Sequence, residues 1–166
     1  MKLIKLWEAD AERAYALQNT FAAEENGFLN SAFGLSFVEY QEYLRAREGY
    51  SRGIGLPEGH VPDTVYILED NGTYVGLFNL RHCLNDALRE GAGHIGYAVS
   101  PAFRRRGYAA EGLRLLIQEA KGVIPEEEIY LSVSKNNRPS LKVQQKNGAY
   151  IHHESDQKFF TRIPLR

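Results

Sequence analysis

The segment HIGYAVSPAFRRRGYAAEGLRLLIQEAK runs from His94 to Lys121 and decides the fold of this chain. Its first part, His94–Val99, is rich in apolar, aromatic and β-branched residues, which predicts a strand. Its last part carries apolar residues along one face of a helix, at Ala109, Leu113, Leu116, Ile117 and Ala120. A turn with one proline and three consecutive arginines joins the two parts. The segment therefore predicts a strand, a basic turn and a helix.

The turn before this helix has the properties of an anion site. The first turn of a helix leaves backbone N–H groups without partners, and the helix dipole favours negative charge there. Gly107 has no Cβ, so the backbone can approach a ligand closely at that position. We therefore expect the run from Arg104 to Ala109 to bind a pyrophosphate. The alternative is a solvated basic turn before an ordinary amphipathic helix.

The pattern Arg104-x-x-Gly107-x-Ala109, after a strand that ends at Val99, resembles the coenzyme A pyrophosphate loop of the GNAT N-acetyltransferases. In that family the pattern is Arg or Gln, two residues, Gly, one residue, and Gly or Ala. The resemblance implies acetyl-coenzyme A as co-substrate. It also implies that the loop residues bind this cofactor, namely Arg104, Arg105, Arg106, Gly107, Tyr108 and Ala109. A nucleotide-binding protein is disfavoured because no Gly-x-x-x-x-Gly-Lys-Ser/Thr loop exists.

The composition is that of an ordinary globular protein. With 166 residues, 43% of them hydrophobic and 25% charged, we expect residues 1–166 to form a single domain. The resemblance implies that this is a GNAT domain. The net charge of −1 gives no general attraction to nucleic acid or to an acidic membrane. The N-terminus turns acidic too soon for a secretory signal, and no apolar run approaches the ~20 residues of a membrane span. We expect a cytoplasmic protein, and the sequence leaves a homodimer open.

Alternation of apolar residues and turn signals predict the elements on either side of this segment. The expected strands are Lys2–Trp7, Thr64–Glu69, Thr73–Leu80 with a continuation through Leu84, Ile129–Val133, Ala149–Glu154 and Lys158–Ile163. The expected helices are Asp10–Glu24, a helix capped by Ser36, and Asn136–Lys146. Between them, Gly49–Pro62 reads as a long irregular loop, and Asn71-Gly72 as a hairpin turn. This order is that of the GNAT fold, an α/β fold with a mixed, mostly antiparallel sheet of about seven strands and flanking helices.

The resemblance implies a place for the rest of the cofactor. In the family the fourth strand parts from the fifth, and pantetheine hydrogen-bonds to the exposed backbone of the fourth strand. Here that strand contributes Tyr97, Ala98 and Val99. Such binding needs a row of unpaired N–H and C=O groups, so the alternative is a fully paired central strand. Asn137 matches the Asn of the family's Asn-x-x-Ser, which contacts the cofactor, although Asn is also an ordinary N-cap.

The chain departs from the family at the proton donor. The family often places a tyrosine four residues before the glycine that follows the next helix, and this tyrosine protonates the leaving thiolate. Gln144 occupies that position here, and a glutamine cannot act as the acid. Tyr97, Tyr108 and Tyr150 remain as unranked candidates. This departure is the one support for an alternative function, a GNAT-fold protein that binds or senses coenzyme A without turnover.

Two histidines are candidates for the general base, because a histidine titrates near the operating pH. His94 begins the fourth strand, where several GNAT enzymes place a proton-accepting glutamate. His82 lies near the end of the preceding strand, so antiparallel pairing would bring the two close together. A structural role is the alternative for both. His152 and His153 should point to opposite sides of a strand, so we expect no metal site.

These observations predict an N-acetyltransferase. We expect the acetyl group to pass from acetyl-coenzyme A to an amine by direct attack on the thioester in a ternary complex. A strand N–H would polarise the carbonyl. The acceptor is a small-molecule or peptide amine that the sequence does not identify.

Overall fold

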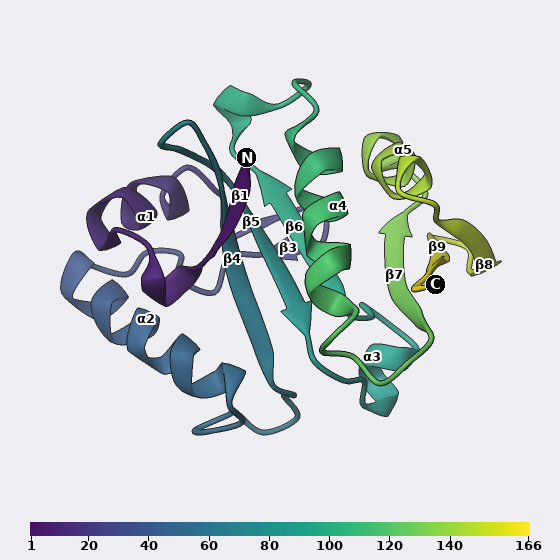
Figure 1. The fold of residues 1–166 in the computed structure, drawn as a ribbon, viewed down its shortest axis with the longest axis horizontal. Helices are drawn as coiled ribbons and strands as arrows, with labels where there is room; N and C mark the ends of the chain where they lie inside the picture. The colour runs from purple at the N-terminus through teal and green to yellow at the C-terminus, as the bar shows by residue number, and fades with distance from the viewer.

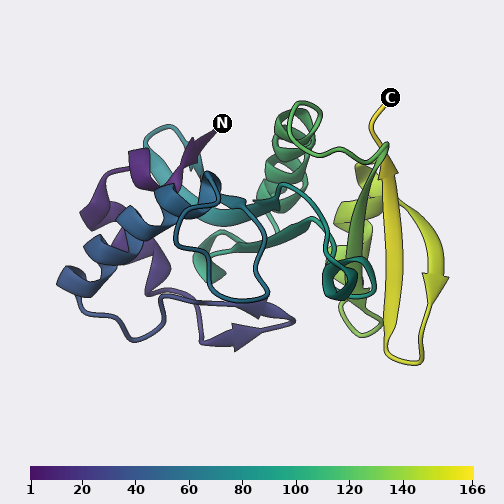
Figure 2. The ribbon, with the colours of Figure 1, turned by 90° about the horizontal axis from the view of Figure 1, so that it is seen from below.

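The structure is a computed structural model that describes all residues, Met1–Arg166, and it contains two antiparallel sheets side by side (Figures 1 and 2). The larger sheet has the order β1-β4-β5-β6, and the smaller has the order β7-β9-β8. Their strands are β1 (Lys2–Lys5), β4 (Asp63–Asp70), β5 (Thr73–Arg81), β6 (Ile95–Val99), β7 (Glu128–Ser134), β8 (Tyr150–Glu154) and β9 (Lys158–Pro164). These seven strands and their antiparallel pairing confirm the expected fold class.

Helices cover both faces of the larger sheet. Helices α1 (Ala11–Gln18) and α2 (Phe37–Ser51) pack on one face, and α4 (Tyr108–Ala120) packs on the other (Figure 1). Helix α5 (Arg138–Lys146) lies beside α4 and against β7. The remaining elements are short: β2 (Glu24–Glu25), β3 (Phe28–Leu29), α3 (Asp86–Arg89) and the 3₁₀ turns η1 (Leu6–Glu8) and η2 (Pro101–Phe103). No helix has the length and apolar character needed to cross a membrane.

The predicted helix starts are confirmed by their caps. The Ser36 hydroxyl accepts from the Glu39 N–H at 3.3 Å, and the Glu39 carboxylate accepts from the Ser36 N–H at 2.7 Å, which is a capping box. The Asp10 carboxylate caps α1 by accepting from the Arg13 N–H at 2.9 Å. Asn137 caps α5 by accepting from the Ser140 N–H at 3.3 Å. Side-chain acceptors at these positions satisfy N–H groups that the helices leave unpaired.

Three predicted boundaries were wrong. The first strand ends at Lys5 rather than at Trp7, because Leu6 turns into the core and starts the 3₁₀ turn η1. Helix α1 ends at Gln18, well before Glu24, and the expected loop after it contains the β2–β3 hairpin. The Asn30 amide donates to the carbonyl of Gln18, the last residue of α1, at 3.3 Å and to that of Phe21 at 3.1 Å, which stabilises the early end. Strand β5 ends at Arg81, and the chain then enters α3.

The expected alternation of His152 and His153 was also wrong. The pairing of β8 with β9 shifts register between Ile151 and His153, which marks a β-bulge. A bulge inserts one extra residue and breaks the alternation of side chains. As a result, the Nδ1 atoms of the two imidazoles lie 2.8 Å apart.

Strands β6 and β7 point the same way, meet at one end and then diverge (Figure 1). At the meeting point, the His94 N–H donates to the Tyr130 carbonyl at 2.8 Å, and Gly93 bridges Leu131. A Cβ on Gly93 would overlap the Tyr130 carbonyl, and its φ of +69° is in the left-handed region, so glycine suits this contact. Beyond this point each strand pairs only within its own sheet.

We expect Gly112→Ala to destabilise the fold, because a Cβ at this position in α4 would overlap the ring of Phe78, which is fully buried. Alanine normally gains about 1 kcal/mol over glycine in a helix. Overpacking a core costs about 1–3 kcal/mol, so the free energy of unfolding should fall instead of rising. Urea unfolding measures this free energy. Gly122→Ala is the control, since a Cβ on Gly122 meets no atom within 4 Å. Equal or higher stability of Gly112→Ala would contradict the packing described here.

Candidate active site

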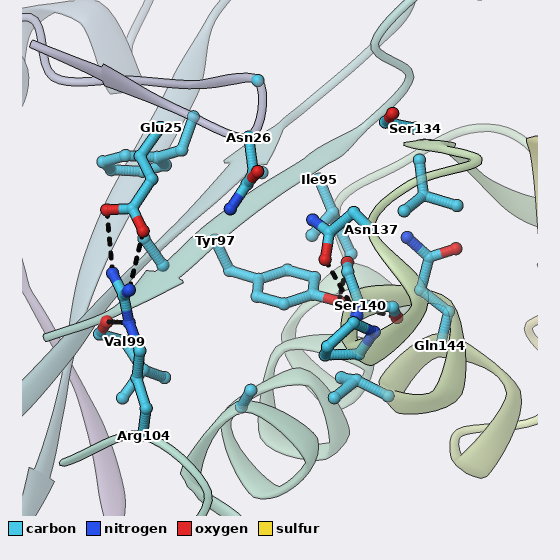
Figure 3. Close-up of a pocket in the computed structure, with 18 of the residues that line it drawn as sticks. Glu25, Asn26, Ile95, Tyr97, Val99, Arg104, Ser134, Asn137, Ser140 and Gln144 are labelled. Carbon is cyan, nitrogen blue, oxygen red and sulfur yellow. Dashed lines mark hydrogen bonds and ion pairs between the residues drawn. The ribbon is translucent and has the colours of Figure 1, made fainter. Parts of the chain in front are cut away.

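A cavity of about 830 Å³ occupies the space between the diverging strands (Figure 3). One wall is β6, and the opposite wall is β7 together with α5. The start of α4 closes one end, and the β2–β3 hairpin lies across the mouth. The cavity therefore contacts most of the predicted cofactor residues, namely Tyr97, Ala98, Val99, Arg104, Arg105, Gly107, Tyr108, Ala109 and Asn137.

The edge of β6 that faces this cavity has free backbone groups. On its other edge β6 pairs with β5, where the Arg81 N–H donates to the His94 carbonyl and the Ser100 N–H to the Val75 carbonyl. Residues of an antiparallel strand alternate in the direction of their hydrogen bonds, so even-numbered positions bond to β5. Tyr97 and Val99 consequently direct their N–H and C=O groups toward the cavity. Ala98 lines the cavity, but its backbone bonds to β5.

The N-terminus of α4 also faces this cavity. Gly107 occupies its N-cap position with φ of +83°, and no side chain caps the helix. Arg105 is left-handed as well, with φ of +63°, which a non-glycine residue adopts at some cost. The N–H groups of the first helical turn, beginning at Tyr108, have no partner within the helix. This end of the cavity can thus accept an anion through the backbone.

The three arginines of the turn have different surroundings. Arg104 forms a two-pronged pair with the carboxylate of Glu25, at 2.6 and 2.9 Å, and its Nε donates to the Val99 carbonyl at 3.0 Å (Figure 3). The hydrogen bond from Arg104 lowers the pKa of Glu25. Arg105 lines the cavity, whereas the guanidinium of Arg106 lies outside it, over the ring of Phe103. Of the three, Arg105 is the one poised for a bound anion.

Tyr97 crosses the cavity from β6 to α5 (Figure 3). Its phenolic oxygen lies 2.8 Å from the Ser140 hydroxyl, and its ring stacks on Phe78 with centroids 5.7 Å apart. Burial raises the pKa of Tyr97, and the contacts with Ser140 and Gln144 oppose this shift. Gln144 is buried and accepts a hydrogen bond from Thr161 at 2.6 Å. Tyr97 therefore brings a protonated phenol next to the position where the family often has its tyrosine.

The other two candidate tyrosines are placed differently. Tyr108 lines the cavity, but its hydroxyl donates to the Asp70 carboxylate at 2.8 Å. Tyr150 is exposed, bonds to Glu128 at 2.7 Å and does not line the cavity. The geometry thus ranks Tyr97 first among the three.

His94 does not line the cavity, and its side chain is completely buried. Its Nδ1 accepts from the Tyr130 N–H at 2.9 Å, so the ring hydrogen is on Nε2, 3.0 Å from the Glu126 carboxylate. Burial lowers the pKa of His94, and Glu126 only partly opposes this, so the imidazole is neutral at pH 7. With both nitrogens bonded, this ring has no free site for a substrate proton.

His82 lies outside the cavity as well. Its Nε2 is 2.8 Å from the Thr64 hydroxyl, and burial lowers its pKa. Antiparallel pairing places the backbone of Arg81, the neighbour of His82, opposite that of His94, as expected. Neither His82 nor His94 lines the cavity. Their roles as general base stay predictions, which these contacts do not favour.

Some residues at the site were missed by the sequence reasoning. Glu25 and Asn26 reach the cavity on the β2–β3 hairpin, in a segment expected to be a plain loop. Arg47 lies on the buried face of α2 with Tyr40 and Leu44. Its spacing of seven residues from Tyr40 was the available signal, since it places a charged residue on an inward-facing stripe.

Comparison with known proteins gives a family and a set of structural neighbours. The acetyltransferase (GNAT) family model matches residues 14–149, and no curated protein matches the chain. The N-acetyltransferase PseH of Campylobacter jejuni, in complex with acetyl coenzyme A, has 13% identity and a TM-score of 0.62 over 99% of both chains. A chimera of spermidine N-acetyltransferase SpeG from Vibrio cholerae and hSSAT has 16% identity and a TM-score of 0.66 over 99% of this chain and 97% of its own. At these identities the likeness establishes the fold alone.

We expect Gly107→Val to abolish binding of coenzyme A. A Cβ at this position meets no atom within 4 Å, so the side chain would fit the empty protein but project toward the space of a bound anion. A valine at this positive φ is strained by about 1–2 kcal/mol, so the experiment needs a second variant with the same strain as a control. Gly148→Val is matched, because Gly148 has φ of +87°, equally open surroundings and no contact with the cavity. Calorimetry should show lost affinity in the first variant only, and equal affinities would refute the anion site.

We expect the free energy of unfolding to fall as the pH drops through about 6.5. Burial lowers the pKa of His94 below its ordinary value of 6.5, and that of His82 likewise. Between the folded and unfolded pKa values the unfolded chain binds more protons, so stability rises with pH there and is lost toward acid. Urea unfolding at a series of pH values measures the slope. The variant His94→Gln should flatten it, and an unchanged slope would show that His94 does not titrate in this way.

Proposed function

The chain belongs to the acetyltransferase (GNAT) family, and we propose that it transfers acetyl from acetyl-coenzyme A to an amine by direct attack in a ternary complex. It is an acyltransferase with acetyl-coenzyme A as co-substrate. The acceptor and the order of the chemical steps are the proposed part. We further propose that residues 1–166 act as one unit.

One observation carries this proposal: a single cavity joins the free edge of β6 to the N-terminus of α4. The free N–H of Val99 and the free C=O of Tyr97 suit amide groups of pantetheine, which can bind as an added strand. Unpaired N–H groups at the start of α4, with Arg105 beside them, suit the pyrophosphate. One extended cofactor could therefore place its pantetheine along β6 and its pyrophosphate at the start of α4. Asn137 and the loop from Arg104 to Ala109 would complete the binding site.

The reaction requires one bond to form and one to break. The amine nitrogen attacks the thioester carbon, and the carbonyl oxygen gains negative charge that the N–H of Tyr97 would stabilise. The carbon–sulfur bond then breaks, and the sulfur leaves with the electron pair. We assign the phenol of Tyr97 as the group that protonates this sulfur, after which solvent restores the phenol.

The acceptor must lose a proton, and we propose that water in the cavity takes it. His94 has both nitrogens bonded, and His82 lies outside the cavity, so neither contacts the space in which an amine would bind. Cys83, the single cysteine, also lies outside this space. An acetylated cysteine therefore has no support from the geometry, which favours direct transfer.

Direct transfer is tested with purified protein, acetyl-coenzyme A and a panel of amines. Release of the thiol should depend on an amine, and the mass of the protein should remain unchanged when acetyl-coenzyme A is added alone. An acetylated protein that then transfers its acetyl group to an amine would replace direct attack with a two-step route. Binding of coenzyme A without release of thiol for any amine would favour the alternative of a non-catalytic binding protein.

We expect Tyr97→Phe to lower kcat by about 10²-fold, the lower end of the usual contribution of a general acid. The ring is retained, so stacking on Phe78 and the affinity for coenzyme A should change little. Tyr108→Phe is the matched control, because Tyr108 also lines the cavity but bonds to Asp70. Steady-state rates of thiol release compare the two variants. A Tyr97→Phe enzyme with the kcat of the unmodified protein would remove Tyr97 from this role.

A further inference from the structure

A second, smaller cavity of about 190 Å³ opens beside the first, between α2 and the larger sheet. The two cavities share wall residues on β6, on β5 and on the β2–β3 hairpin: Gly27, Phe28, Arg81, Ala92 and Gly96. The smaller cavity therefore meets the larger one next to Gly96, the neighbour of Tyr97. This is the place from which an acceptor amine could reach a thioester held along β6.

The smaller cavity contains a buried guanidinium with unused donors. Arg47 on α2 lines it and is only 8% exposed. Its Nη2 pairs with the Asp63 carboxylate at 2.7 Å, whereas its Nε is buried without a hydrogen-bond partner. A buried charge with unsatisfied N–H groups is rare in proteins unless a ligand or another group completes it.

A second guanidinium lies near the first. Arg81, at the end of β5, lines both cavities, and its Nη1 donates to the Gly93 carbonyl at 3.0 Å. Burial lowers the pKa of Arg81, the positive charge of Arg47 adds to this shift, and Asp63 opposes it. The positive charges of Arg47 and Arg81 are thus opposed by the single negative charge of Asp63. No acidic side chain lines the smaller cavity. The site has positive charge in excess.

The same cavity also contains an unpaired acceptor. Asn79 lines it, and its Oδ1 is buried without a hydrogen-bond partner. On the sheet Asn79 stands directly opposite Gly96, at the junction with the larger cavity. A Cβ on Gly96 would meet no atom within 4 Å, so the junction is open. An amine that donates to Asn79 would lie at this opening.

We propose that the acceptor is a small amine that carries a carboxylate, with the carboxylate bound by Arg47 and Arg81 and the amine held by Asn79 at the junction beside Gly96. This proposal rests on the proposed acetyl transfer and specifies its acceptor. Guanidinium groups match carboxylates with paired hydrogen bonds, and a carboxylate would neutralise the excess charge. A polyamine would instead bring a further positive charge next to two arginines, which is unfavourable at short range.

Matched pairs of acceptors test the charge preference. The probes are γ-aminobutyrate and small α-amino acids, each compared with its own amide, and spermidine as a cationic amine. We expect kcat/KM from thiol release to favour the acid over its amide by about tenfold or more, since a charge-assisted pair commonly contributes that much. Equal rates within the pairs, or a preference for the amide or for spermidine, overturn the proposal while acetyl transfer itself stands.

A binding measurement separates this proposal from the enzymatic one. If no amine supports turnover, calorimetry with coenzyme A present compares N-acetyl-γ-aminobutyrate with its amide. Preferential binding of the acid supports the carboxylate site even though the proposed transfer has failed. Equal binding of acid and amide, or no binding of either, overturns the carboxylate site.

Two variants of the ion pair should shift the acid-to-amide ratio in opposite directions. Asp63→Asn removes the negative charge beside Arg47, so the ratio should rise about tenfold, whereas Arg47→Gln removes a guanidinium and should lower it by a similar factor. Structural damage would not produce opposite signs. The affinity for coenzyme A reports whether each variant is folded, since neither residue lines the larger cavity. A shift of the ratio in the same direction in both folded variants overturns the assignment.

Discussion

The contact between β6 and β7 at His94 is the constraint on which the site depends. One backbone hydrogen bond to Tyr130 joins the two strands, and both nitrogens of the buried imidazole strengthen the same contact. Because the strands are joined there and separate afterwards, the backbone of β6 beyond Ile95 has one bonded edge and one free edge. A buried, neutral histidine suits this task, since it can accept from one strand and donate to Glu126 at the same time. His94, whose role as general base stays a prediction, thus holds the contact between the two strands.

Packing inside the larger sheet controls the side chain that faces the thioester. Gly112 in α4 leaves room for the ring of Phe78, and Phe78 supports the ring of Tyr97. Tyr97 then reaches Ser140 on α5 and spans the space between the two sheets. The phenol and the free N–H of Tyr97 come from one residue, so the same strand would serve the carbonyl oxygen and the leaving sulfur. Under this proposal the phenol of Tyr97 would take the role that Gln144 cannot.

Charge is divided between the two cavities. The larger cavity has the proposed anion site, made of helix backbone and Arg105, and there the charge of Arg104 is already matched by Glu25. The smaller cavity has two arginines and a partly matching aspartate that does not line it. The two cavities share wall residues that include Gly96 and Arg81, and this junction is where the two substrates would meet.

The sequence by itself determined the elements that local chemistry specifies. The loop from Arg104 to Ala109, the capping residues Ser36 and Asn137, and the order of strands and helices all follow from patterns within a few residues. They indicated the fold class and the family resemblance, and nine of the ten cofactor residues predicted from them line the larger cavity. Boundaries such as the end of α1 were wrong because a distant side chain, that of Asn30, bonds to the carbonyls of Gln18 and Phe21.

Only the tertiary structure decided which of these residues face a substrate. Sequence spacing does not show that both nitrogens of His94 are bonded, that Glu25 matches Arg104, or that Tyr97 reaches α5. The smaller cavity depends on α2 and β5, in which Arg47 and Asn79 are 32 residues apart in the chain and face one space. The physical reason is that hydrogen bonds and burial at a site are made between segments far apart in sequence, whereas patterns report only on neighbours along the chain.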